Sequence, residues 1–170
     1  MTEMAGGFLR ALGGPVQILF LAALALAARS RGELLRLTAM FLVGQAAAVL
    51  IVPHTAWTPA PRFVEAAAAL AVAYLAVEIL TLPKAGARWL IAGVLGVFYG
   101  LFLYLFLLGA QYRPGFVLAG AAVAEVALVA VAATVFARLV KWGEAVRIVQ
   151  VAASALLMFG MVWFILRLRS

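Results

Sequence analysis

The sequence predicts an all-α protein, a polytopic membrane bundle of about six transmembrane helices. Hydrophobic residues make up 68% of its 170 residues and charged residues only 11%, whereas an average soluble domain is about 45–50% apolar and about 25% charged. Several apolar runs approach the roughly 20 residues that a helix needs to cross a bilayer. Only short polar turns separate these runs, so residues 1–170 are predicted to form one transmembrane domain. This composition excludes a soluble enzyme, a disordered tail and a nucleic-acid-binding domain.

Each predicted helix is an apolar run bounded by turn residues. The runs do not alternate as the strands of a membrane barrel would, and proline or glycine stands in most of the turns between them. Tryptophans lie near several run ends, where indoles favour the membrane interface. The six predicted spans are residues 8 or 15 to 28, 37–52, 63–82, 89–110, 115–137 and 145–166.

The net charge of +7 comes from basic residues that stand near the ends of the apolar runs. This placement is typical of membrane anchoring and orientation, so we expect lipids as partners and no nucleic acid. The side that holds the loops after spans one, three and five carries more basic residues, which predicts that it is cytoplasmic and that both termini face outward from a bacterial cytoplasmic membrane. That side carries Arg29, Arg31, Arg36, Lys84, Arg88, Arg138, Lys141 and Arg147, and the other carries Arg10, Arg62, Arg113, Arg167 and Arg169.

The residue inventory argues against metal and acid–base chemistry. The chain has no cysteine, no aspartate and one histidine, His54, so thiolate sites, iron–sulfur clusters and thioether haem are excluded. A transition-metal site normally needs several converging ligands. No Ser–His pair or carboxylate dyad suggests nucleophilic catalysis. We therefore expect no cofactor, no metal site and no enzymatic activity.

Polar side chains inside the predicted spans are the candidates for function, because such groups are costly in lipid. One interpretation is an ion or proton path along Glu125 and Glu78. The alternative is hydrogen bonding between helices, with Glu125 protonated, and we expect this structural role more often. The candidates form a predicted column with Gln17 and Glu65 outermost, Gln45, Tyr99 and Glu125 central, and Glu78 innermost.

Three glycines, Gly93, Gly96 and Gly100, follow one another at small-residue spacing in the fourth span. Such spacing lets a second helix approach closely. We expect these residues to serve helix packing.

Several segments together resemble the HupE/UreJ family, six-helix membrane proteins associated with hydrogenase and urease maturation and thought to be nickel or cobalt permeases. The N-terminal stretch 7–20 is similar to the family's opening motif, with Gly7, Phe8, Gly14 and Phe20 in place. The later segments 37–45, 64–79 and 96–100 look like the family's second, third and fourth helices. The resemblance keeps the family's glutamates at Glu65, Glu78 and Glu125.

The family's membrane histidines are replaced throughout this resemblance. Arg10 stands for the first histidine, Val16 and Gln17 for an Asp-His pair, Gly44 and Gln45 for His-Ser, and Tyr99 for another histidine, while Ile79 replaces an asparagine. Glutamine and tyrosine side chains are poor ligands for nickel or cobalt. The resemblance therefore implies the family's scaffold without its metal path.

Two functions remain open. The retained framework and lost ligands favour a structural or accessory subunit of a larger membrane complex, whose apolar faces would bind other subunits, lipid or pigment. The alternative is a permease for protons, a monovalent cation or a small solute, which would use Glu125 and Glu78.

Overall fold

The computed structural model describes residues 2–81, 87–142 and 145–169, with the side chains of residues 141–146 left out. Lys84 and Glu144, and the side chains of Lys141 and Trp142, therefore lie outside the described part. All regular structure in the described ranges is helical, which confirms the all-α prediction. The helices are α1 (Thr2–Gly13), α2 (Pro15–Ala27), α3 (Arg31–Ile51), a 3-10 turn η1 (Val52–His54), α4 (Pro61–Thr81), α5 (Arg88–Ala110), α6 (Pro114–Trp142) and α7 (Ala145–Arg169).

The first predicted span is broken into two helices. Five described segments are long and apolar enough to cross a membrane, and α1 and α2 qualify as a sixth span only as a pair bent by 76°. The break falls at Gly14, because Pro15 begins α2 and has no backbone N–H to continue the ladder from α1. Counted as one broken span, this pair completes the predicted bundle of six.

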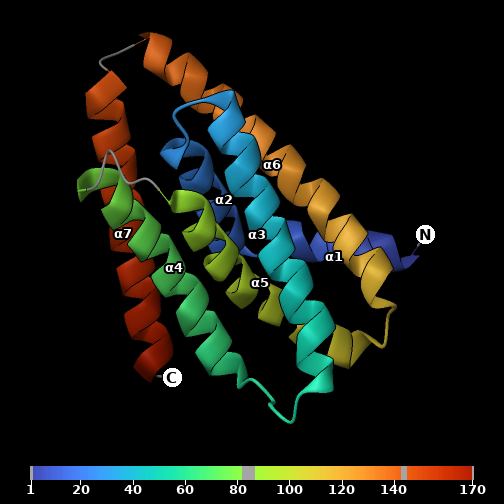
Figure 1. Ribbon diagram of the computed structural model, residues 1–170. Coiled ribbons are helices and arrows are strands. Elements are labelled where there is room, and N and C mark those ends of the chain that lie inside the picture. Colours follow the sequence, from blue (N-terminus) through green and yellow to red (C-terminus); the bar gives the residue numbers. More distant parts are fainter. Residues whose placement is uncertain (1, 82–86, 143–144, 170) are drawn as a thin grey trace.

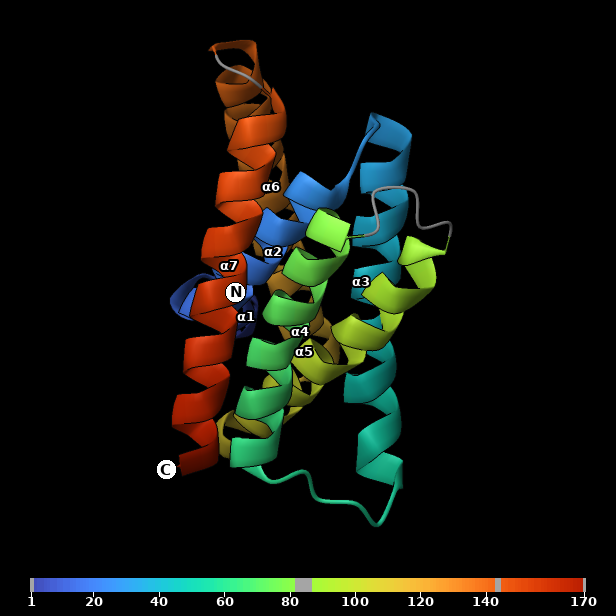
Figure 2. The ribbon, with the colours of Figure 1, turned by 90° about the vertical axis from the view of Figure 1, so that its left-hand side faces the viewer.

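The helices pack in pairs that are distant in sequence. α3 lies along α5, α4 along α7 and α1 along α6, while α2 fits between α4 and α6. Figure 1 shows that α1 runs across the long direction of the bundle, unlike the other helices. In Figure 2, α5 crosses obliquely between the more upright α3 and α4. The start of α2 therefore lies inside the bundle among other helices.

Local sequence explains where the helices begin. Pro15, Pro61 and Pro114 each occupy the first position of a helix, where a missing N–H costs nothing. Ser30 caps α3 by accepting a hydrogen bond of 3.1 Å from the Glu33 N–H, and Glu33 in turn accepts one of 2.9 Å from the Arg29 N–H. These paired interactions satisfy backbone donors that the helix start would otherwise leave free.

Glycines bring α3 and α5 into close contact. A Cβ atom on Gly96 would lie 2.2 Å from the Phe41 carbonyl oxygen, and one on Gly100 would lie 2.5 Å from the Gln45 carbonyl oxygen. Gly93 is different, because its nearest neighbour, Met40 Cε, would lie at 3.4 Å. At Gly96 and Gly100 the backbone of α5 therefore approaches the backbone of α3 more closely than any side chain would allow.

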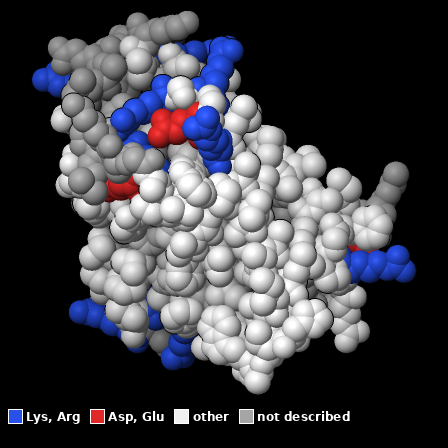
Figure 3. Space-filling view, in the orientation of Figure 1, with Lys and Arg blue, Asp and Glu red and all other residues white. Residues whose placement is uncertain are grey.

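The surface follows the pattern expected for a chain in lipid. Figure 3 shows a broad face without charged residues, with Lys, Arg and Glu side chains gathered at the upper end and others at the lower edge and the right-hand margin. We call the end that holds the α2–α3 connection and the start of α5 the Arg88 end. The opposite end, with the start of α4 and the end of α7, is called the Glu65 end.

Candidate functional site

Three of the candidate polar residues meet inside the bundle. Glu125 on α6 is fully buried, Gln45 on α3 is 1% exposed and Gln17 on α2 is 4% exposed. Gln45 Nε2 donates a hydrogen bond of 2.7 Å to Glu125 Oε1, and Gln17 Nε2 donates to the same oxygen. The three side chains form the Gln17–Gln45–Glu125 cluster.

The second carboxyl oxygen of Glu125 is not used in this cluster. Oε2 is buried and has no hydrogen-bond partner among the residues that the structure describes. A carboxyl group offers two oxygens and can either accept hydrogen bonds or, when protonated, donate one. Buried polar atoms are rarely left without a partner, so this oxygen has free capacity to bind a proton, a cation or water.

An aromatic layer borders the cluster on the side of the Arg88 end. Phe20 follows Gln17 by about one helical turn and Phe41 precedes Gln45 by one turn. Their rings lie 5.1 Å apart between centroids, and the Tyr99 ring lies 4.6 Å from Phe20 and 5.6 Å from Phe41. The Tyr99 hydroxyl is 3.2 Å from the Ala68 carbonyl oxygen and 3.4 Å from that of Val16. Phe20, Phe41 and Tyr99 form the aromatic layer.

A cavity of about 130 Å³ lies at the break between α1 and α2. Gly14 and Pro15 line it, and Gln17 and Tyr99 connect it to the cluster and the aromatic layer. Its other lining residues include Arg10, Glu65 and Arg167, with Arg167 Nε 2.9 Å from Glu65 Oε2. We call this space the break cavity, and it lies towards the Glu65 end.

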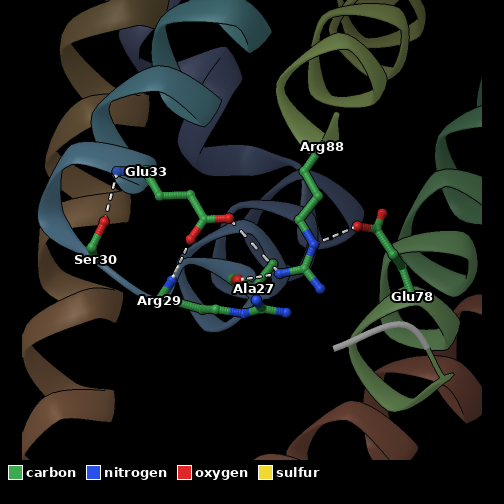
Figure 4. Close-up of polar contacts among 6 residues, drawn as sticks. All are labelled: Ala27, Arg29, Ser30, Glu33, Glu78 and Arg88. Carbon is green, nitrogen blue, oxygen red and sulfur yellow. Dashed lines mark hydrogen bonds and ion pairs between the residues drawn. The ribbon is translucent and has the colours of Figure 1, made fainter. Parts of the chain in front are cut away.

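A second polar group closes the Arg88 end of the bundle (Figure 4). Arg88 Nε lies 2.7 Å from Glu78 Oε1, and Arg88 Nη1 lies 3.9 Å from Glu33 Oε1. Arg88 Nη1 also donates a hydrogen bond of 2.9 Å to the Ala27 carbonyl oxygen at the end of α2. This Arg88 network ties the ends of four helices together, and both Arg88 and Glu78 are buried.

A second cavity, of about 250 Å³, adjoins the Arg88 network. Glu33, Arg88 and Leu37 are among its lining residues. Leu37 lies one helical turn from Phe41 on the same buried stripe of α3. The aromatic layer therefore separates this Arg88 cavity from the break cavity.

The structure brings only part of the predicted column together. Gln17 lies in the central cluster rather than at the outer end, because the break places the start of α2 inside the bundle. Glu78 pairs with Arg88 and Glu65 with Arg167, and neither contacts Glu125. Gly96 and Gly100 lie on the α5 face against α3, whereas Gly93 has more room.

Two arginines at helix ends or turns are less exposed than solvated anchors would be, with Arg88 buried and Arg10 half-buried. Arg88 is 5% exposed, and the Arg10 guanidinium lies 4.2 Å from the centroid of the Phe102 ring. A basic residue at the end of an apolar run is indistinguishable in sequence from a solvated anchor. The acidic partner of Arg88, ten residues earlier in α4, is the one signal that could have identified it.

His54 lies in η1 and is exposed. Among the described residues, no group of three or more His, Cys, Asp or Glu side chains is placed to hold a metal ion. No protein-family model, curated protein or solved structure was found to match the chain. The resemblance to the HupE/UreJ family therefore stays a prediction from sequence.

Proposed function

We propose that this membrane bundle is a permease for a small ion or polar solute, built on a HupE/UreJ-like scaffold without a transition-metal path. The observation that supports it best is the break in the first span beside the Gln17–Gln45–Glu125 cluster. Many secondary transporters bind substrate where a helix is interrupted near the bilayer midplane, because unwound backbone and helix ends there offer polar groups. Glu125 supplies an ionisable residue at this point, and such residues are functional candidates by default.

The two cavities support the same proposal. The break cavity approaches the aromatic layer from the Glu65 end, and the Arg88 cavity approaches it from the other end. A transporter that alternates its access needs a central site with a closed barrier toward at least one side. In our proposal the aromatic layer is the central barrier, and the Arg88 network holds the helix ends closed on its side.

The side chains near the break limit the class of substrate. Amide, carboxyl and phenol groups suit a proton, a monovalent cation or a small hydrogen-bonding solute, whereas nickel and cobalt favour imidazole and other nitrogen ligands. A cavity of about 130 Å³ has room for only a small molecule. We therefore expect a substrate of a few heavy atoms.

Flux measurements in proteoliposomes test this proposal. Purified protein is reconstituted, a potassium gradient with valinomycin sets the membrane potential, and dyes inside the vesicles report protons or sodium. Osmotic swelling reports small neutral solutes such as urea and glycerol. The proposal expects one of these to enter faster than into protein-free vesicles. Rates equal to those of protein-free vesicles for all of them would refute it.

The second candidate is an accessory subunit of a larger membrane complex, and the position of α7 favours it. Only 17% of the apolar window of α7 is buried, against 56% for α4. A helix so loosely covered offers a long apolar face to lipid or to a neighbouring subunit. Purification in a mild detergent, followed by mass spectrometry, tests this candidate. A stoichiometric membrane partner would support it, and a chain that runs alone would argue against it.

A further inference from the structure

A groove of about 630 Å³ lies at the Arg88 end, where it shares Ser30 with the Arg88 cavity but has otherwise separate walls. Leu26 and Leu34 line it from α2 and α3, and Phe136 and Val140 line it from α6. In Figure 2 the end of α6 and the start of α7 stand apart from the start of α3, with α2 between them. The walls of this groove are apolar along most of its length.

The rim of the groove is basic. Arg29 and Arg31 line it and are both exposed. In the described ranges neither side chain forms an ion pair. The nearest acid in sequence, Glu33, already accepts from the Arg29 N–H and faces Arg88. Among the side chains that the structure describes, no acidic one lines the groove, so the described part of its rim carries positive charge.

An apolar groove below two arginines matches one class of occupant. The acyl chain of a phospholipid can lie against the walls while its phosphate meets the guanidinium groups, and arginine suits phosphate because its planar fork of donors can bind two oxygens. A neutral partner helix or a zwitterionic lipid would fill the walls without balancing the charge at the rim. Basic pockets between membrane helices commonly bind anionic headgroups.

We propose that this groove is a binding site for one anionic phospholipid, held by Arg29 and Arg31 and by the apolar walls between α2, α3 and α6. The proposal does not depend on the permease function. The site lies among the residues predicted to face the cytoplasm, so the lipid would come from the leaflet on that side.

Native mass spectrometry of the full chain tests the proposal. The protein is equilibrated in detergent with equal amounts of phosphatidylglycerol and phosphatidylethanolamine that carry the same acyl chains. We expect phosphatidylglycerol adducts to be retained preferentially. The double variant Arg29→Gln and Arg31→Gln should reduce that preference by about tenfold, because each basic residue near an anionic headgroup adds to the affinity.

Two further variants separate this site from general attraction to a basic protein. Arg113→Gln with Arg169→Gln removes the same charge elsewhere and should leave the preference unchanged. Ala133→Phe fills the groove with both arginines kept and should lower retention of phosphatidylglycerol. Equal retention of the two lipids by the unaltered chain would overturn the proposal. An equal loss in the control pair, or no loss in Ala133→Phe, would overturn it too.

Discussion

Gln45 Nε2 on α3 donates a hydrogen bond of 2.7 Å to Glu125 Oε1 on α6, although the two residues are 80 positions apart in sequence. Neither side chain is exposed by more than 1%. Gln17 joins them from α2, so the carboxyl group links three helices at the break in the first span. Its second oxygen has no partner in the described part of the chain, and the permease proposal rests on this oxygen.

Replacing Gln45 with leucine should destabilise the bundle. The variant removes one of the two donors to Glu125 Oε1, and hydrogen bonds between membrane helices contribute about 1 kcal/mol each. A lower midpoint of thermal unfolding in detergent is the expected result. Gln150→Leu is the control, because Gln150 is exposed on α7. Equal midpoints for the two variants would show that the hydrogen bond contributes nothing.

Alanine at Gly96 should be far more damaging than alanine at Gly93 on the same helix. A Cβ atom at Gly96 would meet the Phe41 carbonyl oxygen at 2.2 Å, whereas at Gly93 it would meet the flexible end of Met40 at 3.4 Å. Overpacking of this kind costs about 1–3 kcal/mol. The unfolding midpoint should fall for Gly96→Ala and stay near the original for Gly93→Ala. Two similar values would contradict the close α3–α5 packing.

The two ion pairs should differ in their effect on stability. Glu78 and Arg88 are 2% and 5% exposed, whereas Glu65 and Arg167 are 31% and 38% exposed. Breaking a buried pair leaves an uncompensated charge and costs about 3–5 kcal/mol, but an exposed pair contributes about 0–1 kcal/mol. Glu78→Gln should therefore lower the free energy of unfolding much more than Glu65→Gln. The reverse order would rule out the Arg88 network as a stabilising element.

The predicted orientation can be tested cleanly, because the chain has no cysteine. Gly32→Cys places one thiol at an exposed position in the first turn of α3, and Thr58→Cys places one at an exposed position in the loop between η1 and α4, beyond the other end of α3. In intact cells a membrane-impermeant maleimide should label the thiol at position 58 and spare the one at position 32. Permeabilised cells, in which both should react, provide the control. Labelling of position 32 alone would show that the orientation is opposite to the predicted one.

The helical architecture could be predicted because it follows from composition and from the length of the apolar runs. Backbone groups in lipid must form their hydrogen bonds within a helix, so each long apolar run is expected to be helical. The 76° bend was the exception. Gly13, Gly14 and Pro15 lie within a run that still averages as apolar, and sequence alone did not indicate whether they would end a helix or interrupt one.

The grouping of the polar residues was less predictable. Gln17, Gln45 and Glu125 were identified individually as polar groups inside spans, but their meeting point depends on which helices are neighbours. The pairing of α3 with α5 and α4 with α7 is a tertiary property. For the same reason Glu78 was grouped with Glu125, although its partner is Arg88, which we had placed in a polar turn.

The most direct test of the permease proposal is the initial flux of its identified substrate in proteoliposomes that contain Glu125→Gln. This change keeps the size of the side chain and removes its ability to ionise. The account predicts that flux falls to the level of protein-free vesicles, while Glu3→Gln, at a glutamate that lines neither cavity, keeps the original rate. An unchanged rate in correctly folded Glu125→Gln protein would contradict it.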